Sequence, residues 1–206
     1  MAGNPITVIF DLGNVILPFD PLKPCRVLAR ETGNTPDEVA DLIYGHGLER
    51  AFEEGKIDGR VFTRECGRVL GIKLEYQRFR NLWADMFTEN QAVSALIQWL
   101  HSRYPLVLLS NTNVWHWEHA LAKYPILGCF SAYVLSYEVG VLKPDIAIYQ
   151  AARRCVPDGS EAVFIDDIPA NAEGAAQAGI HGIQFTDVDR LVHDLTRFGI
   201  DIPSRG

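Results

Sequence analysis

The amino-acid sequence predicts an α/β fold, a doubly wound (Rossmann-like) parallel sheet into which a helical bundle is inserted. Short apolar runs that end in polar residues recur along the chain, as is typical of buried parallel strands. Segments with apolar residues at helical spacing alternate with the later runs, which predicts strand–helix–strand units. The long stretch between residues 18 and 90 has helical patterns but no strand, which predicts the insert.

The sheet is predicted from five apolar runs, and the helices that cover it from four periodic segments. The predicted strands are residues 6–10, 106–109, 133–135, 162–165 and 182–185. The predicted helices around them are residues 92–102, 145–155, 171–178 and 189–198. The second of these helices follows a proline, which is common at the start of a helix.

The helical insert is predicted from four further periodic segments, residues 22–32, 36–45, 59–70 and 74–87. Thr35 followed by Pro36 indicates a capped helix start, and Gly71 and Asn90 are predicted helix ends. Aromatic residues at helical spacing are expected to form the core of the insert; they are Phe79, Trp83 and Phe87. The predicted division is a core domain of residues 1–17 and 91–206, and a helical domain of residues 18–90.

Composition excludes several classes of function. The 206 residues are 48% hydrophobic and 22% charged, which is typical of a globular protein. The net charge of −7 disfavours nonspecific binding to nucleic acid or to an anionic membrane. No signal-peptide pattern or membrane span is predicted. Four scattered cysteines without a CxxC pair indicate reduced thiols, and we therefore expect a cytoplasmic protein.

Chemically active side chains follow the carboxyl ends of several predicted strands, where open α/β sheets bind ligands. Asp11 follows the first strand, Ser110 and Asn111 the second, and Asp166 and Asp167 the fourth. A lysine, Lys143, lies between the third predicted strand and the helix predicted at residues 145–155. Clustered carboxylates repel one another unless a cation neutralises them, and Mg²⁺ suits carboxylates together with a substrate phosphate. A carboxylate of this kind can also attack phosphorus as a nucleophile.

Four motifs in this order and spacing resemble the haloacid dehalogenase (HAD) superfamily. They are VIFDLGNVIL (residues 8–17), LLSNTN (108–113), GVLKPD (140–145) and VFIDDIPANAEGAAQAGI (163–180). The helical insert after the first motif resembles the family's four-helix cap. The combination of motifs is most similar to a bacterial branch that includes an α-glucose-1-phosphate phosphatase. The resemblance implies a Mg²⁺-dependent phosphatase acting on a small phosphorylated metabolite, with a sugar phosphate as the expected substrate.

The resemblance also implies a role for each motif residue. Asp11 is the expected nucleophile and, with Asp167 and the backbone carbonyl of Gly13, a Mg²⁺ ligand. Lys143 is expected to pair with the phosphate and with Asp11. The remaining expected roles are phosphate binding by Ser110 and Asn111, support of Asp167 by Asp166 facing Lys143, and orientation of Asp167 or a metal-bound water by Asn171.

Position 13 departs from the family pattern. Most family phosphatases carry a second Asp two residues after the nucleophile, where it acts as general acid and base. Glycine supplies a carbonyl ligand but no proton, and general acid–base catalysis is typically worth about 10²–10⁴ in rate. Three explanations of the missing acid remain open: the substrate has a good leaving group, another residue supplies the proton, or the enzyme is slow or inactive. Asp20 is the predicted substitute.

Two other functions and one histidine motif remain open. Because 2-haloacid dehalogenases also lack the second Asp, a metal-free dehalogenase is an alternative, although the Asp166–Asp167 pair argues against it. A catalytically weak phosphometabolite-binding protein is the second alternative. His116 is predicted to touch substrate because it follows the phosphate-binding motif; packing among tryptophans is favoured over a metal pair with His119. No prediction of oligomeric state follows.

Overall fold

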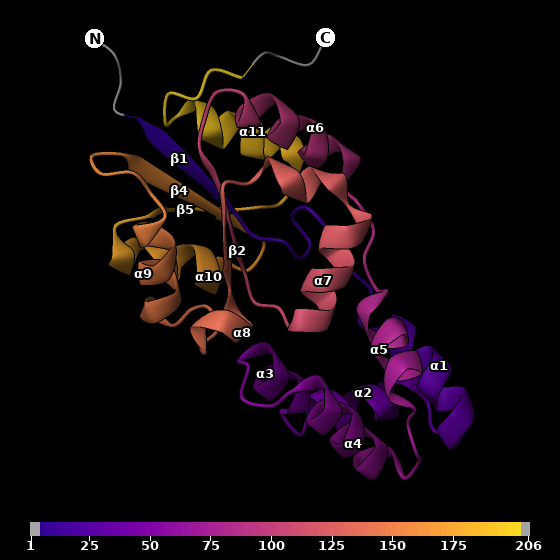
Figure 1. Cartoon of the computed structure of the whole chain (residues 1–206). Coiled ribbons are helices and arrows are strands. Elements are labelled where there is room, and N and C mark those ends of the chain that lie inside the picture. The colour runs from indigo at the N-terminus through magenta and orange to yellow at the C-terminus, as the bar shows by residue number, and fades with distance from the viewer. Residues whose placement is uncertain (1–4, 203–206) are drawn as a thin grey trace.

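The computed structural model describes residues 5–202 and contains a five-stranded, all-parallel sheet in the order β3-β2-β1-β4-β5 (Figure 1). The strands are β1 (Ile6–Phe10), β2 (Leu106–Ser110), β3 (Ala132–Leu135), β4 (Glu161–Asp166) and β5 (His181–Gln184). Each predicted strand is confirmed to within one residue at either end. The three central strands β2, β1 and β4 carry the predicted site residues at their carboxyl ends.

Helices cover both faces of the sheet, so the predicted doubly wound arrangement is confirmed. Val8 and Phe10 of β1 belong to a hydrophobic cluster with α6 (Gln91–His101) and α11 (Val188–Thr196). Ile9, which points to the opposite face, belongs to a second cluster with α9 (Ile146–Arg154). All three strand residues are fully buried, and each such side chain contributes about 1.5–3 kcal/mol of transfer free energy.

The remaining helices of this part lie between the strands and these three helices in the sequence. They are α7 (Val114–Lys123), α8 (Ser136–Val139), α10 (Pro169–Gly174) and the 3₁₀ helices η1 (Pro125–Cys129) and η2 (Ala175–Ala178). The helix predicted at residues 171–178 is therefore α10 together with η2, and it begins two residues earlier, at Pro169.

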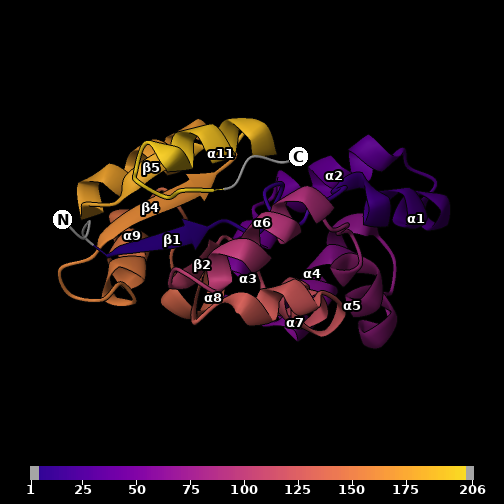
Figure 2. The same cartoon turned by 90° about the horizontal axis from the view of Figure 1, so that it is seen from above.

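The helical insert lies beyond the end of the sheet toward which the strands point (Figures 1 and 2). Its helices are α1 (Leu22–Thr32), α2 (Pro36–Tyr44), α3 (Leu48–Glu53), α4 (Gly59–Leu70) and α5 (Tyr76–Ala84). They enclose their own hydrophobic cluster, which includes Phe79 and Trp83. The predicted cap at Thr35 is confirmed as a capping box with Glu38, and Gly71 ends α4 with a left-handed φ of 68°.

Three details of the insert differ from the prediction. Helix α3 was not predicted, because its six residues bury one large side chain, Phe52, and form no periodic pattern. Asn90 does not end α5, which stops at Ala84; its side chain instead accepts a hydrogen bond from Val93 and caps α6. Phe87 packs in the cluster of the sheet rather than in that of the insert.

A tryptophan joins the two parts of the molecule. Trp115, in the first turn of α7, packs in the insert's cluster against Phe52, Phe62 and Phe79. Gly59 of α4 lies against this indole so closely that a Cβ there would overlap the ring. The insert is therefore anchored on a helix that begins just after the LLSNTN motif.

Across residues 5–202, every helix falls short of the length and apolar character that crossing a membrane requires.

Candidate active site

Asp11 stands where β1 ends, between the ends of β2 and β4. Its backbone amide donates to Ile165 of β4, which continues the sheet by one residue. Its Oδ1 atom accepts hydrogen bonds from the Leu12 amide at 2.7 Å and from Lys143 Nζ at 2.8 Å. Within the described chain, Oδ2 has no hydrogen bond. The carboxylate is thus held by one oxygen and offers the other.

Lys143 connects the carboxylates of the first and last motifs. Its ammonium lies 2.8 Å from Asp11 Oδ1 and 2.6 Å from Asp166 Oδ2, and its side chain is 1% exposed. The backbone of Lys143 is held by Asn111, whose Oδ1 accepts from Lys143 N at 2.8 Å and whose Nδ2 donates to Lys143 O at 3.2 Å. The side-chain amide of Asn111 therefore positions Lys143.

Asp166 is fully buried and all its hydrogen-bonding capacity is used. Its oxygens accept from Lys143, from the Ile168 amide at 2.8 Å, and from Asn171 Nδ2 at 3.1 and 3.2 Å. The structure therefore brings Asp166 to Lys143, as expected. Asn171 contacts Asp166 rather than Asp167, because α10 begins at Pro169 and turns its amide back toward the buried acid.

Asp167 is half-buried and is oriented by a residue that the sequence did not indicate. Asn14 Nδ2 donates to Asp167 Oδ2 at 3.1 Å. Asn14 has a φ of 54°, a left-handed conformation that asparagine tolerates better than most residues. The turn after β1 thus presents both the Asp11 carboxylate and a donor for Asp167. The only signal in the sequence is the Gly13-Asn14 turn itself.

The three acids at this edge form a candidate metal site. One carboxylate oxygen from each of Asp11, Asp166 and Asp167 lies within 4.8 Å of the others, and among residues 5–202 this is the one group of three or more such ligands. Because the oxygens of Asp166 are engaged, Asp11 and Asp167 are the two acids that remain able to ligate. Hard oxygen ligands with room for water and phosphate fit Mg²⁺.

The electrostatics of the triad also favour a cation. Burial, as the largest cause, raises the pKa of Asp11 to about 7; Asp166 acts in the same direction and Lys143 opposes both. Burial lowers the pKa of Lys143, but the charges of Asp11 and Asp166 outweigh it, so the pKa stays above the ordinary lysine value. One ammonium faces three carboxylates, and a divalent cation would relieve the surplus negative charge.

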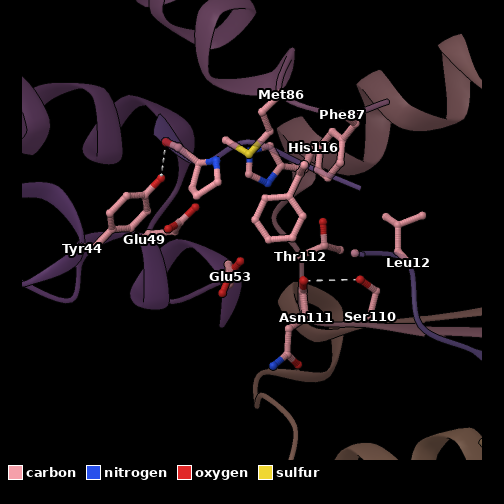
Figure 3. Close-up of a pocket in the computed structure, with 13 residues that line it drawn as sticks. Leu12, Tyr44, Glu49, Glu53, Met86, Phe87, Ser110, Asn111, Thr112 and His116 are labelled. Carbon is pink, nitrogen blue, oxygen red and sulfur yellow. Dashed lines mark hydrogen bonds between the residues drawn. The ribbon is translucent and has the colours of Figure 1, made fainter. Parts of the chain in front are cut away.

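A pocket of about 140 Å³ lies between the sheet edge and the insert (Figure 3). From the sheet side it is lined by Gly13, Ser110 and Asn111, and from the insert by Glu49 and Glu53 of α3. Apolar side chains of Phe19, Met86 and Phe87 complete the wall. Of the predicted phosphate-binding residues, Ser110 and Asn111 therefore face the same small space as the insert, whereas Lys143 lies behind them and does not line it.

His116 lines this pocket, but both of its ring nitrogens are engaged by the protein. Nε2 donates to the Trp83 carbonyl at 3.1 Å, and Nδ1 accepts from Asn113 Nδ2 at 3.0 Å. Burial lowers the pKa of His116 to about 4, so the ring is neutral near pH 7. His116 ties α7 to the end of α5, and only its ring carbons can face a ligand.

Asp20 and Gly13, two further predicted site residues, differ in whether they face the pocket. Asp20 is ion-paired to Arg26 at 2.7 Å and accepts from the Leu22 amide at the start of α1; it does not line the pocket. The carbonyl of Gly13 accepts from Val15 N at 2.7 Å, which leaves its second lone pair for a metal ion. Of these two, only Gly13 faces the pocket.

Two glutamates of α3 give the pocket an acidic wall. Glu49 and Glu53 are one helical turn apart and half-buried, and neither carboxylate has a hydrogen bond or ion pair in the described part of the chain. Burial raises the pKa of Glu49 well above its ordinary value, with Glu53 adding to the effect. Burial likewise raises the pKa of Glu53 to about 7.

The fold is that of one known family. The chain belongs to the haloacid dehalogenase-like hydrolase family, whose model matches residues 7–179. Among curated proteins it is similar to D-ribitol-5-phosphate phosphatase of Bacteroides thetaiotaomicron, at 27% identity over 86% of this chain and 90% of that protein.

Solved structures share the whole fold. A HAD family enzyme of B. thetaiotaomicron, in complex with magnesium and inorganic phosphate, superposes with a TM-score of 0.79 at 22% identity, over 91% of this chain and 98% of that one. The L-2-haloacid dehalogenase of Xanthobacter autotrophicus superposes with a TM-score of 0.63 at 15% identity, over 96% of this chain and 84% of that one. At these identities the similarity shows the fold, and the two reactions must be separated by the site.

Proposed function

We propose that this protein is a Mg²⁺-dependent phosphatase that hydrolyses a small phosphorylated metabolite through an aspartyl-phosphate on Asp11. The observation that carries the proposal is the arrangement around Lys143. Its ammonium bridges Asp11 and the buried Asp166, while the half-buried Asp167 lies close enough to share a metal ion with Asp11.

Each residue of the site then has a defined task in phosphoryl transfer. The free Oδ2 of Asp11, or the oxygen that remains after metal binding, attacks phosphorus, and Lys143 and Ser110 bind the phosphoryl oxygens. Asp11, Asp167 and the Gly13 carbonyl would hold Mg²⁺, and the bound ion would neutralise charge on the phosphate. Asp166, Asn171 and Asn111 keep Lys143 in place. Such positioning and charge compensation provide most of the catalysis of phosphoryl transfer.

The helical insert, residues 18–90, is in this proposal the cap that closes over the core formed by residues 1–17 and 91–206. Its own hydrophobic cluster and the position of α3 against the pocket support that division. Trp115 anchors the cap beside the phosphate-binding loop. Closure excludes water from the reacting phosphate and lets cap side chains select the leaving group.

The pocket favours a small, uncharged leaving group that carries hydroxyls. About 140 Å³ is below the usual 300–1,000 Å³ of small-molecule pockets. Glu49 and Glu53 can form hydrogen bonds with hydroxyls, and among the described residues that line the pocket there is no lysine or arginine to bind a second phosphate or a carboxylate. A sugar or sugar-alcohol phosphate meets both conditions, which agrees with the D-ribitol 5-phosphate named for the similar phosphatase. We also propose that the enzyme is cytoplasmic, a location compatible with a small phosphorylated metabolite as substrate.

The alternative of a metal-free 2-haloacid dehalogenase has less support. Asp167 lies beside Asp11 and needs a cation to offset its charge, and Asn14 orients it for that role. Chloride release from 2-chloropropionate that survives excess chelator would favour the dehalogenase.

The test is a panel of sugar, sugar-alcohol, glycolate and bisphosphate esters, each assayed for phosphate release with Mg²⁺ and with excess chelator. Uncharged polyol esters should be hydrolysed best, only with Mg²⁺, and not by Asp11→Asn. Equal activity in Asp11→Asn, or activity without metal, would overturn the proposal. A protein that binds phosphate and Mg²⁺ but hydrolyses nothing in the panel would be a phosphometabolite-binding protein instead.

A further inference from the structure

A carboxyl group from the cap faces the pocket that Gly13 lines. Gly13 has no side chain and therefore no proton to offer a leaving group. Glu53 of α3 lines the same pocket, and Figure 3 shows Glu53 and Glu49 on one side of the drawn residues, with Leu12 and Ser110 on the other. A substrate whose phosphate is bound at the sheet edge would therefore extend its leaving group toward Glu53.

The end of α3 is fixed to the sheet side by backbone contacts. The Ser136 hydroxyl is fully buried and lies 2.7 Å from the Glu53 carbonyl and 2.9 Å from the Thr112 carbonyl. It also accepts from the Thr112 amide at 2.9 Å. Thr112 follows Ser110 and Asn111, so one hydroxyl connects Glu53 to the phosphate-binding loop. The position of Glu53 is thus set by the loop that would hold the phosphate.

The next residues bring α3 equally close to α8. Gly55 has a left-handed φ of 65°, and a Cβ at this position would collide with the carbonyl of Tyr137. Only glycine therefore permits this approach. The contact holds the carboxyl end of α3 against the sheet side at a second point.

Glu53 differs from Asp20 and Glu54 because, within residues 5–202, its carboxylate has no hydrogen bond or ion pair, a property that it shares with Glu49. Glu53 is preferred over Glu49 because the charges of Lys143 and Asp11 act on it and because its carbonyl is bound by Ser136. Asp20 is held by Arg26, and Glu54 by Arg50 at 3.2 Å and Lys56 at 2.6 Å. The charged and titratable groups that face Glu53 are, from the sheet side, Lys143 and Asp11, and from the insert, Glu49, Glu54, Arg50 and Tyr44.

The same surroundings let the carboxyl group keep its proton near neutral pH. Burial is the largest cause that raises the pKa of Glu53 to about 7; Asp11 and Glu54 add to it, and Lys143 and Arg50 oppose it. A general acid–base works best when its pKa lies near the working pH. The hydrogen-bonded Glu54, by contrast, has a pKa below its ordinary value.

We propose that Glu53 replaces the missing acidic side chain at position 13 and is the general acid and base of the reaction. The inference rests on the proposed phosphatase function. In the first step an oxygen of Asp11 bonds to phosphorus, the bond from phosphorus to the leaving oxygen breaks, and the Glu53 carboxyl proton moves to that oxygen. In the second step the Glu53 carboxylate takes a proton from water as the water oxygen attacks phosphorus and the bond to Asp11 breaks. Asp11 and protonated Glu53 are regenerated, with inorganic phosphate as product.

The test compares two esters that differ in their need for an acid. p-Nitrophenyl phosphate has a leaving group that departs without a proton, whereas D-ribitol 5-phosphate releases an alkoxide that needs one. kcat/KM reports the first step, and Glu53→Gln should lower it about 10²–10⁴-fold for the ribitol ester and only a few-fold for the nitrophenyl ester. Because the second step then becomes slow, the nitrophenyl ester should give a burst of nitrophenol.

The matched control is Glu49→Gln, which removes a carboxyl group one turn earlier in the same helix. It should change the two kcat/KM values by similar factors and give no burst. Equal losses with both esters in Glu53→Gln, or no loss with either, would overturn the inference. If the wild type hydrolyses neither ester in an Asp11-dependent way, the proposed function itself fails, and the two failures are thus distinguishable.

A measurement on the metal-free protein tests the same residue without turnover. Carbon-13 NMR of glutamate side-chain carboxyls should show a group titrating near pH 7 that disappears in Glu53→Gln, and the second raised group, Glu49, is identified by its loss in Glu49→Gln. Glu53→Asp should recover part of the kcat/KM for the ribitol ester, which a merely misfolded variant would not do. A Glu53 carboxyl that titrates at the value of an exposed glutamate would contradict the proposal.

Discussion

Lys143 and Asp11 form an ion pair of 2.8 Å inside the protein, and Lys143 reaches Asp166 at 2.6 Å from the same atom. Asp11 follows β1, Asp166 ends β4, and Lys143 belongs to the loop between α8 and α9, so the two contacts join three distant motifs. Because all three side chains are at least nine-tenths buried, this charge balance matters for both folding and chemistry.

Lys143→Met should abolish phosphate release and destabilise the metal-free protein by about 3–5 kcal/mol, because two buried carboxylates lose the one cation that pairs with them among residues 5–202. Denaturant unfolding measures the stability. Lys123→Met is the matched control: its ion pair with Asp85 is half-exposed and should contribute at most about 1 kcal/mol. Equal stability losses in the two variants would contradict the role given to Lys143.

Substitutions of Asn14 and Asn171 should have different effects, one on metal binding and the other on the buried Asp166 that pairs with Lys143. Asn14 donates to Asp167 and Asn171 to Asp166. Asn14→Gly, which keeps the left-handed turn, should weaken Mg²⁺ binding about 10–100-fold. Asn171→Ala should cost about 1–3 kcal/mol of stability because Asp166 loses its donor, with a smaller change in Mg²⁺ affinity. Calorimetric titration with Mg²⁺ would refute this division if Asn171→Ala had the larger effect on affinity.

Much of this site follows from the sequence, because parallel strands bring their carboxyl ends to one edge. Asp11, Ser110 and Asp166 could be placed together on that ground, and the motifs linked Lys143 to them. The partner of Asn171 could not be predicted, since it depends on where α10 begins. Glu53 was one of several acids between the helices predicted at residues 36–45 and 59–70. Its place at the pocket depends on how the short helix α3 packs in the folded protein, which no local pattern indicates. The ion pair between Arg26 and Asp20 could not be predicted either, because no sequence pattern marks it.

His116 should make the protein less stable in acid. Its pKa is lowered to about 4 by burial, while the unfolded chain protonates near 6.5. Below that value the unfolded state binds a proton that the folded state does not, so stability falls as pH decreases from 6.5 toward 4. The slope from this residue is at most about 1.4 kcal/mol per pH unit. The stability difference between wild type and His116→Gln should therefore shrink from pH 7 to pH 5; a constant difference would show that His116 titrates normally.

Gly59→Ala should disturb the junction between cap and core. The new methyl group would overlap the Trp115 indole, and overpacking of this kind typically costs about 1–3 kcal/mol. Gly128→Ala is the control, because among the described residues no atom beyond its own helical turn lies within 4 Å of a Cβ there; we expect a change within about 0.5 kcal/mol. Thermal unfolding and tryptophan fluorescence would detect the difference, and two variants of equal stability would argue against a tight junction.

The central claim is that Asp11 carries the phosphoryl group during turnover. The direct measurement is rapid acid quenching of the enzyme with Mg²⁺ and p-nitrophenyl phosphate, followed by peptide mass spectrometry. Glu53→Gln should accumulate most of the intermediate, because the water that attacks phosphorus lacks its base. We predict a phosphoryl group on the peptide that contains Asp11 and none in Asp11→Asn. If the wild type releases phosphate but no phosphorylated Asp11 is found in the wild type or in Glu53→Gln, the account is contradicted.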